Sequence, residues 1–366
     1  MINKEFRRKY SLQQCKKQGQ GGQGKILTAV NLESGNTVIV KKIVNDASGI
    51  AACAWRERQA LSSLSHQNVI KLLDSYCEGN STLLILEKCE VDLSVLLQAV
   101  RISGQFSVGN RHFLLQSLFQ ALSYIHGQGF VHRDVKLSNV LLMRDSTVKL
   151  SDFGLSVKNP LGLPLSDAGS KFYKAPELLL NSKIKGREGD LFAAGMLALH
   201  LLLNCDDEEV TVYDLIAQEQ TDHSAGQIIN ILSQLLGTPK REELAHINDM
   251  YFQTYFSEHV EGKLAEILLQ FEASEEEVKI ITGLIRWDPA QRIGADECCK
   301  LLQGAQTEQI DVAKILNIKK AHEEEKEQIA PPMQVQELNM NDLDAPLAGL
   351  DQSTDFCTSL FKSGLL

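Results

Sequence analysis

The sequence lacks the features that would place it in a membrane or in an oxidising compartment. Its first residues are polar and contain no apolar signal region, so no secretion signal is predicted. The longest apolar run, Leu191 to Leu203, holds 13 residues and includes His200, which suits a buried helix and is too short for a membrane span. None of the eight cysteines forms a C-x-x-C pair. We therefore expect reduced thiols in the cytoplasm, the nucleus or both.

An excess of basic residues is also missing. The 37 lysines and arginines stand against 47 aspartates and glutamates, and the net charge of −10 argues against nucleic acid as the main partner. Hydrophobic residues make up 43% and charged residues 23% of the 366 positions, as in an ordinary globular protein. A chain of this length can bury the cores of two lobes or domains.

Two short polar stretches carry the clearest chemical signal. Residues 132–139 read His-Arg-Asp-Val-Lys-Leu-Ser-Asn, and residues 152–154 read Asp-Phe-Gly. Phosphoryl transfer needs a carboxylate at the attacking hydroxyl, oxygen ligands for Mg²⁺ and a cation near the transferring group. We assign these roles to Asp134, to Asp152 with Asn139, and to Lys136. An accidental polar loop, the alternative, would have to match six positions in order.

The first part of the chain predicts a sheet that carries a glycine-rich loop. Residues 10–45 alternate apolar and polar side chains in short runs, which is typical of antiparallel strands. Between two such runs lie Gly19, Gly21 and Gly24, followed by Ile26. A lone G-x-G-x-x-G also marks dinucleotide folds and ordinary turns. The strand-like flanks favour a loop whose backbone amides approach nucleotide phosphates.

A lysine and a glutamate are predicted to complete the phosphate site. Lys41 ends the strand-like run 38–40 and would pair with the α- and β-phosphates of a nucleotide. A helix is predicted over residues 50–64, with Glu57 as the carboxylate that pairs with Lys41. Taken alone, Lys41 could be a solvated strand lysine, and residues 56–58 could be a surface charge cluster.

The remaining nucleotide-binding residues are predicted around a hinge. The apolar run 82–86 indicates a buried strand, and residues 87–90 follow it as the hinge. The motifs at 132–139 and 152–154 resemble those of protein kinases. That resemblance implies Leu86 as a gatekeeper, Glu87 and Cys89 as hinge residues whose backbone bonds the adenine, and Leu141 as an apolar floor beneath it. The bound species we predict are ATP and Mg²⁺.

Residues 10–302 resemble the eukaryotic protein kinase domain, on all of the motifs above. The resemblance implies an α+β, two-lobed kinase fold, with a small β-rich N-lobe and a larger, mostly helical C-lobe. We place the N-lobe at 1–89, the C-lobe at 90–305 and a charged, partly disordered tail at 306–366, which carries the charge run 319–327.

Further residues are similar to those of the serine/threonine class. Lys136 suits that class, as does Ser170, at a position where the class carries a Ser or Thr that touches the catalytic Asp and Lys. The resemblance also implies two structural contacts. Glu177 of the Ala-Pro-Glu motif would pair with Arg292, and Asp190, at the start of a helix, would anchor the backbone of the catalytic loop.

Within the kinases, the sequence is similar to the cyclin-dependent-kinase group and, inside it, to the cell-cycle-related kinase subgroup that is linked to cilia. The stretches that carry this resemblance are 55–57, 91–93, 172–179 and Leu235-Leu236-Gly237-Thr238-Pro239. The resemblance implies protein substrates, a cyclin or cyclin-like activator, and a place in cell-cycle or ciliary signalling, including the cilium itself.

Several regulatory positions depart from that group. Gly22-Gln23 replaces the group's inhibitory Thr-Tyr pair, and Leu165, beside Ser166, replaces its activating Thr. Val157 stands in place of one arginine of the loop-phosphate pocket, and Lys174 in place of the Arg before Ala-Pro-Glu. Residues 50–55 replace the cyclin-contacting signature. Ile39 stands where the family usually has Ala against the adenine, so crowding is expected there. Proline-directed specificity is in doubt because of Lys174.

Two other functions fit the same fold. A pseudokinase scaffold is favoured by Ile39 and by the altered activation loop. It is opposed by intact Lys41, Asp134, Asn139 and Asp152. A small-molecule kinase is opposed by the full activation segment, which includes Ser170. We therefore predict an ATP- and Mg²⁺-dependent protein serine/threonine kinase.

Overall fold

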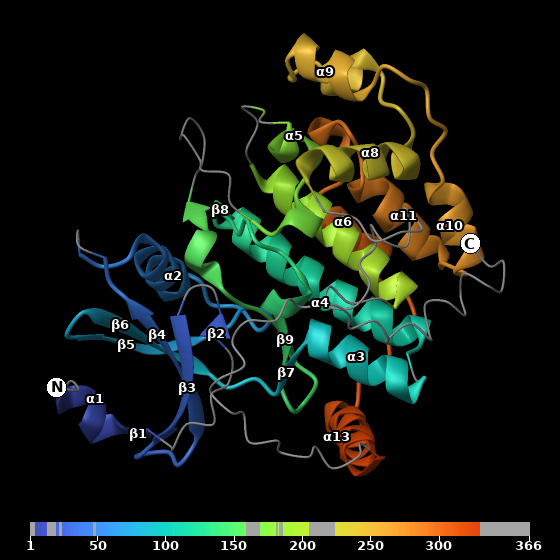
Figure 1. Cartoon of the computed structure of the whole chain (residues 1–366). Coiled ribbons are helices and arrows are strands. Elements are labelled where there is room, and N and C mark those ends of the chain that lie inside the picture. The colour runs from blue at the N-terminus through green and yellow to red at the C-terminus, as the bar shows by residue number, and fades with distance from the viewer. Residues whose placement is uncertain are drawn as a thin grey trace, which may run out of the picture.

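The computed structural model of the protein describes residues 4–12, 20–21, 24–46, 49–104, 106–158, 169–180, 182, 186–204 and 224–329, with side chains undescribed at 20–21 and 322–329. These residues form a small β-rich lobe and a larger helical lobe that meet at a hinge, as expected for the two-lobed α+β kinase fold (Figure 1).

The small lobe is built on an antiparallel sheet, which confirms the strands predicted over residues 10–45. The strands pair in the order β1-β3-β4-β6-β5, and β2 pairs with β3. Their bounds are β1 (Tyr10–Leu12), β2 (Gln20–Gly21), β3 (Gly24–Asn31), β4 (Thr37–Val44), β5 (Leu72–Glu78) and β6 (Ser81–Glu87).

The alternation of β4 decides which side chains face the cleft between the lobes. Val38 and Val40 pack on one face, in a cluster with Phe6 of α1 (Lys4–Lys9). Successive side chains of a strand point to opposite faces, so Ile39 and Lys41 lie on the other face. There α2 (Ala52–Ser63), the helix predicted over 50–64, covers the sheet. α2 thus covers the part of this face near Ile43, whereas Ile39 and Lys41 line the cleft between the lobes.

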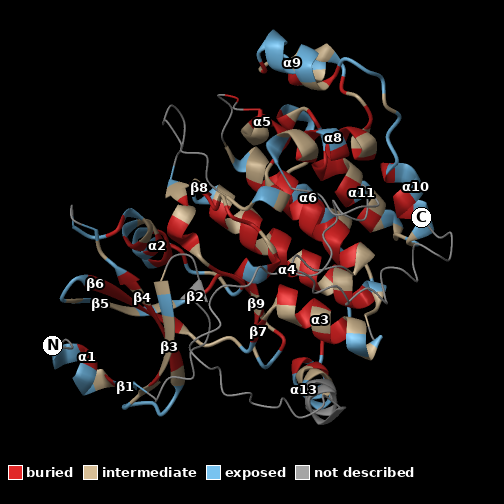
Figure 2. Ribbon diagram, viewed as in Figure 1, coloured by how far each residue is buried: buried red, intermediate tan, exposed pale blue. Residues whose placement is uncertain are grey.

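The large lobe is organised around two long buried helices, α4 (Val108–Gly127) and α6 (Arg187–Leu203), which lie at its centre (Figure 2). The apolar run 191–203 is therefore a buried helix, as predicted. We expected that helix to begin at Asp190, but it begins at Arg187. The other α-helices of this lobe are α3 (Leu93–Ser103), α5 (Pro176–Leu179), α8 (Ala225–Leu236), α9 (Asp249–Tyr255), α10 (Leu264–Gln270), α11 (Glu275–Leu284) and α12 (Ala295–Leu301).

Short strands beneath the hinge hold the predicted catalytic residues in place. A three-stranded sheet has the order β10-β9-β7, and a second pair joins β11 to β8. The catalytic loop runs between β8 and β9, and Asp152 follows β10. The bounds are β7 (Val91–Asp92), β8 (Phe130–Val131), β9 (Val140–Leu142), β10 (Val148–Leu150) and β11 (Val157–Lys158), with 3₁₀ turns η1 (Leu137–Asn139), η2 (Phe153–Leu155), η3 (Lys171–Tyr173), η4 (Arg241–Leu244) and η5 (Pro289–Gln291).

The last described element is α13 (Val312–Ile329), which packs along α3 (Figure 1). It contains the charge run 319–327, and residues 330–366 of the expected tail lie outside the described residues. Across the described part of the chain, no helix combines the length and apolar character needed to cross a membrane. Cys53, Cys89, Cys298 and Cys299 are free thiols.

Candidate active site

A cleft of about 910 Å³ opens between the lobes. Every predicted site residue whose side chain the structure describes lines this cleft. They are Gly24, Ile26, Ile39, Lys41, Glu57, Leu86, Glu87, Cys89, Asp134, Lys136, Asn139, Leu141 and Asp152. Gly21 lies in β2, and Gly19 is outside the described residues.

The hinge end of the cleft combines apolar side chains with an ion pair. Ile39 of β4 pairs with Leu86 of β6 in the sheet register, and Leu141 of β9 also lines the cleft. The Glu87 carboxylate forms an ion pair of 2.9 Å with Lys149. Burial raises the pKa of Cys89 to about 12, so its thiol is neutral at physiological pH.

The glycine-rich stretch is flanked by antiparallel strands, β2 and β3, as the sequence predicted. Gly21 pairs with Gly24 across the β2–β3 register. Gly24 has a φ of +156°, and a Cβ atom there would lie 2.5 Å from the Lys42 carbonyl oxygen. A side chain at this position would force the strands apart, so glycine is required.

Lys41 stands between two carboxylates at the inner end of the cleft. Its Nζ lies 2.7 Å from Glu57 Oε2 and 2.8 Å from Asp152 Oδ1. Burial opposes the charged form of Lys41, but the two carboxylates outweigh it, and the pKa of Lys41 is raised. The cation is therefore fully charged and aimed at the cleft.

Glu57 is the member of this group whose hydrogen bonding is incomplete. Its residue is buried, and its second carboxylate oxygen, Oε1, has no hydrogen-bond partner among the described residues. Burial, and secondarily the charge of Asp152, raise the pKa of Glu57 to about 7, although Lys41 opposes the shift.

The catalytic loop is anchored from below by Asp190, as the resemblance implied. Asp190 accepts hydrogen bonds from the backbone N–H groups of His132, at 2.8 Å, and Arg133, at 2.7 Å. The backbone N–H of Asp134 donates to His132 Nδ1, so the ring proton sits on Nε2, which donates to the Ser151 carbonyl over 2.9 Å. The histidine thus ties the catalytic loop to β10.

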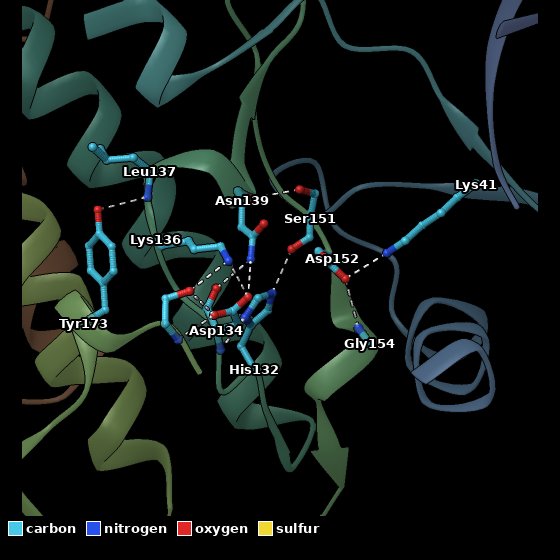
Figure 3. Close-up of polar contacts among 11 residues, drawn as sticks. Lys41, His132, Asp134, Lys136, Leu137, Asn139, Ser151, Asp152, Gly154 and Tyr173 are labelled. Carbon is cyan, nitrogen blue, oxygen red and sulfur yellow. Dashed lines mark hydrogen bonds and ion pairs between the residues drawn. The ribbon is translucent and has the colours of Figure 1, made fainter. Parts of the chain in front are cut away.

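The carboxylate of Asp134 collects donors from three residues (Figure 3). Ser170 donates to Oδ1 from its N–H over 3.1 Å and from its hydroxyl over 2.9 Å, while Asn139 Nδ2 and Lys136 Nζ lie 3.0 and 2.9 Å from Oδ2. Burial would raise the pKa of Asp134, but Lys136 and Ser170 outweigh it and lower that pKa. Asp134 is therefore ionised at neutral pH.

Asp152 presents oxygen to the cleft from a left-handed backbone conformation. Its φ is +58°, uncommon for a residue other than glycine, and such strain concentrates at functional sites. The next residue, Phe153, is buried against His132, with ring centroids 4.7 Å apart. The buried phenylalanine therefore holds Asp152 toward Lys41.

Oxygen donors of Asp152 and Asn139 suit a hard cation such as Mg²⁺, which commonly binds one or two carboxylates together with substrate phosphates and waters. Within the described ranges, no three His, Cys, Asp or Glu residues cluster as a complete metal site. The chemistry of these two oxygen donors would fit a magnesium ion of this kind.

The predicted structural pair of the large lobe is also present. Arg292 Nη1 and Nη2 each donate to one oxygen of Glu177 over 2.7 Å. The guanidinium also lies over the Phe192 ring at 5.0 Å and donates to the Glu188 carbonyl. This buried fork attaches the end of the activation segment to the lobe core.

The regulatory positions are described only in part. Gly22, Gln23, Leu165 and Ser166 lie outside the described residues. Arg56 donates to the Gly154 carbonyl over 2.8 Å, and Arg133 donates to Leu155 over 3.2 Å. Burial and the neighbouring charge of Arg56 lower the pKa of Arg133.

Sequence reasoning missed several residues that line the cleft, namely Ile70, Val91, Asp92, Val95, Ser138, Ser151 and Leu316, whereas Glu90 was expected as part of the hinge. Asp92 had a signal, because an Asp before an apolar helical run is typical of an N-cap, and its carboxylate accepts from Val95 N–H over 3.0 Å. Leu316 had none, since only tertiary packing brings it to the cleft.

The lysine between two carboxylates and the ionised aspartate beside it, all facing one cleft between two lobes, define a phosphotransferase of the kinase type. Residues 12–302 match the model of the family described as protein kinase domain. The chain belongs to the protein kinase family and, within it, to the cyclin-dependent-kinase-like serine/threonine kinases.

Several relatives support this placement. Cyclin-dependent kinase F-4 of Oryza sativa subsp. japonica is 31% identical over 289 residues, which span 77% of this chain and 59% of that protein. Cyclin-dependent kinase 9 of Rattus norvegicus is 30% identical over 301 residues, 76% of each chain. The human cyclin-dependent kinase 9 is 29% identical over 300 residues, also 76% of each. These relatives do not favour the pseudokinase alternative.

A solved structure of the yeast RNA Pol II CTD kinase CTDK-1 complex shows the same fold. The TM-score is 0.66 at 22% identity, over 79% of this chain and 94% of that one. The likeness shows the fold, and the family as a whole uses ATP and Mg²⁺.

Proposed function

We propose that this chain transfers the γ-phosphate of ATP to serine or threonine hydroxyls of protein substrates. The observation that carries the proposal is the Asp134 carboxylate, held by Lys136, Asn139 and Ser170 in the same cleft as Lys41 and Asp152. A scaffold that had lost catalysis would have no need to keep this set together.

We propose that ATP binds with its base at the hinge. The adenine would lie among Ile26, Ile39, Leu86 and Leu141, and would bond the backbone of the hinge at Glu87 and Cys89. The Glu87 N–H donates to the Lys71 carbonyl over 3.1 Å, so we assign the Glu87 carbonyl to the base. Lys41 and the amides of the loop containing Gly19, Gly21 and Gly24 would hold the phosphates.

Asp152 and Asn139 are the residues proposed to hold Mg²⁺, which, when bound, offsets negative charge on the phosphates. Asp134 orients the substrate hydroxyl and accepts its proton as the oxygen attacks. Lys136, already 2.9 Å from Asp134, stabilises the negative charge of the transferring phosphoryl group. Glu57 fixes Lys41. Positioning and electrostatics then account for most of the rate enhancement.

A radiolabel assay on the purified full chain tests this function. The substrate is a peptide library with Ser, Thr or Tyr acceptors and a varied residue after the acceptor. We expect transfer to Ser and Thr, and at least about a hundredfold loss in Asp134→Asn, the scale typical of losing a positioned catalytic group. ATP binding without transfer by the wild type would instead indicate the scaffold.

We further propose a cyclin or cyclin-like activator on the outer face of α2. The relatives are named cyclin-dependent kinases. Here the apolar side chains of Ile50 and Trp55 are 41% and 52% exposed, and they border a small hollow with Arg58. An apolar surface of this kind suits a protein partner.

Kinase activity measured with added purified cyclins tests the proposed partner. Trp55→Glu should abolish activation by the cyclin that binds, whereas Leu269→Glu, an exposed residue of the other lobe, should leave it unchanged. Equal activation of Trp55→Glu and wild type would remove this face from consideration.

We keep the division of the chain at 1–89, 90–305 and 306–366, because the hinge separates β6 from β7 near residue 89. A cytoplasmic or nuclear location remains our proposal. None of the relatives above bears a name that refers to a cilium, so ciliary signalling receives no support from them.

A further inference from the structure

One described side chain beyond the kinase-domain match reaches the nucleotide cleft. The match ends at residue 302, and among the described residues that line the cleft only Leu316 lies past that point. It shares the lining with Val91, Asp92 and Val95, at the hinge and the first turn of α3. This places a wall from the C-terminal segment at the cleft.

The segment that leads to this wall is fastened to the large lobe. The Ser107 hydroxyl donates to the Glu308 carboxylate over 2.6 Å, and Asn110 Nδ2 donates to the Glu308 carbonyl over 2.9 Å. The Ser146 hydroxyl donates to the Ile310 carbonyl over 2.6 Å. These contacts fix the chain just before α13 begins.

The helix itself presents one face to α3. Val312, Ile315, Leu316 and Lys319 follow the spacing of a single helix face. Val312 and Ile315 are buried, and Lys319 Nζ donates to Gln98 Oε1 of α3 over 2.9 Å. Leu316 is therefore held in place on both sides along the helix.

The position of Leu316 in the cleft decides which part of a nucleotide it can meet. Phosphates belong near Lys41 and Asp152, at the inner end. Leu316 lies on α13, which packs along α3, the helix that carries Val95 of the lining just after the hinge. An apolar side chain there can contact the nucleoside and has nothing to offer the phosphates.

We propose that Leu316 is a nucleotide-binding residue, an apolar wall against the nucleoside part of ATP, and that Lys319 is the residue that positions it. The proposal rests on the proposed function, because it requires ATP in this cleft. Contact with the nucleoside persists from substrate to product, so it lowers KM without raising kcat.

Calorimetry with ADP and with adenosine on the full chain tests the wall without any need for phosphotransfer. Leu316→Ala should weaken both ligands by the same factor, about threefold or more, and raise KM for ATP by that factor with kcat unchanged. Leu316→Met, which keeps an apolar side chain of similar volume, should stay near wild type. Asn317→Ala, on the exposed side of α13, is the matched control.

A second variant, which leaves Leu316 itself unchanged, tests the same contact if Leu316→Ala fails to fold. Lys319→Ala removes the bond to Gln98 and should weaken ADP and adenosine in the same direction. Wild-type affinity in Leu316→Ala would overturn the inference alone, as would a loss for ADP without one for adenosine. A wild-type chain that binds no nucleotide would overturn the proposed function, and the inference with it.

Discussion

The Lys136 ammonium donates to the Ser170 hydroxyl over 2.8 Å, across the carboxylate of Asp134. That hydroxyl in turn donates to Asp134 over 2.9 Å. Ser170 belongs to the activation segment, whereas Lys136 belongs to the catalytic loop. One side chain thus couples the placement of the activation segment to the charge distribution around Asp134, the proposed catalytic aspartate.

Removing this hydroxyl should slow catalysis without preventing ATP binding. In Ser170→Ala, Lys136 and Asp134 lose their shared partner, and we expect kcat to fall by about tenfold or more, toward the range for a displaced catalytic group. Ser170→Thr keeps the hydroxyl and should retain most of the activity. Steady-state kinetics on both variants measures the difference in kcat. An alanine variant with wild-type kcat would show that the Ser170 hydroxyl does not contribute to catalysis.

Crowding at Ile39 should limit the affinity for ATP. The side chain lines the cleft together with Leu141, and Ile39 pairs with Leu86 in the sheet register. Extra volume in a packed site costs about 1–3 kcal/mol, so Ile39→Ala should tighten ATP binding by roughly fivefold or more. Calorimetry is the measurement, with Ile39→Val expected between the two. Unchanged or weaker binding in Ile39→Ala would mean that neighbouring residues already make room.

The pairs that hold the site were predictable where motif chemistry demanded them. Lys41 and Glu57 lie far apart in sequence, yet a phosphate-binding lysine needs a carboxylate on a nearby helix, and α2 supplies it at 2.7 Å. The start of α6 was not predictable, because Gly186 offers no side-chain cap to mark it. Leu316 was not predictable either, since its role follows from the packing of α13 on α3.

Losing only one partner of the buried ion pair between Arg292 and Glu177 should strongly destabilise the protein. Both side chains are almost fully buried, at 0% and 2% exposure. Arg292→Ala would leave Glu177 charged and unpaired, so we expect a loss of about 3–5 kcal/mol in the free energy of unfolding. Chemical denaturation measures this loss. Lys300→Ala, which breaks an exposed pair with Asp296, should cost about 0–1 kcal/mol.

A double variant separates the charge from the packing. Arg292→Met with Glu177→Leu removes both charges and should recover a large part of the lost stability. If Arg292→Ala were no less stable than Lys300→Ala, the fork would not contribute to stability as described.

The stability of the protein without nucleotide should depend on pH through Glu57. Burial raises the pKa of Glu57 from its ordinary 4.5 to about 7 in the folded state. Between these values the folded chain holds a proton that the unfolded chain has lost, so the contribution of Glu57 to stability falls as pH rises through this window. The contribution is complete below about pH 4.5 and lost above about pH 7.

The Glu57→Gln variant cannot ionise at this position, so its stability should lack this dependence on pH. Melting temperatures of both proteins from pH 5 to 8 test the difference, which should grow in favour of the glutamine variant as pH rises and level off near neutrality. Parallel melting curves across that range would show that Lys41 keeps Glu57 ionised throughout.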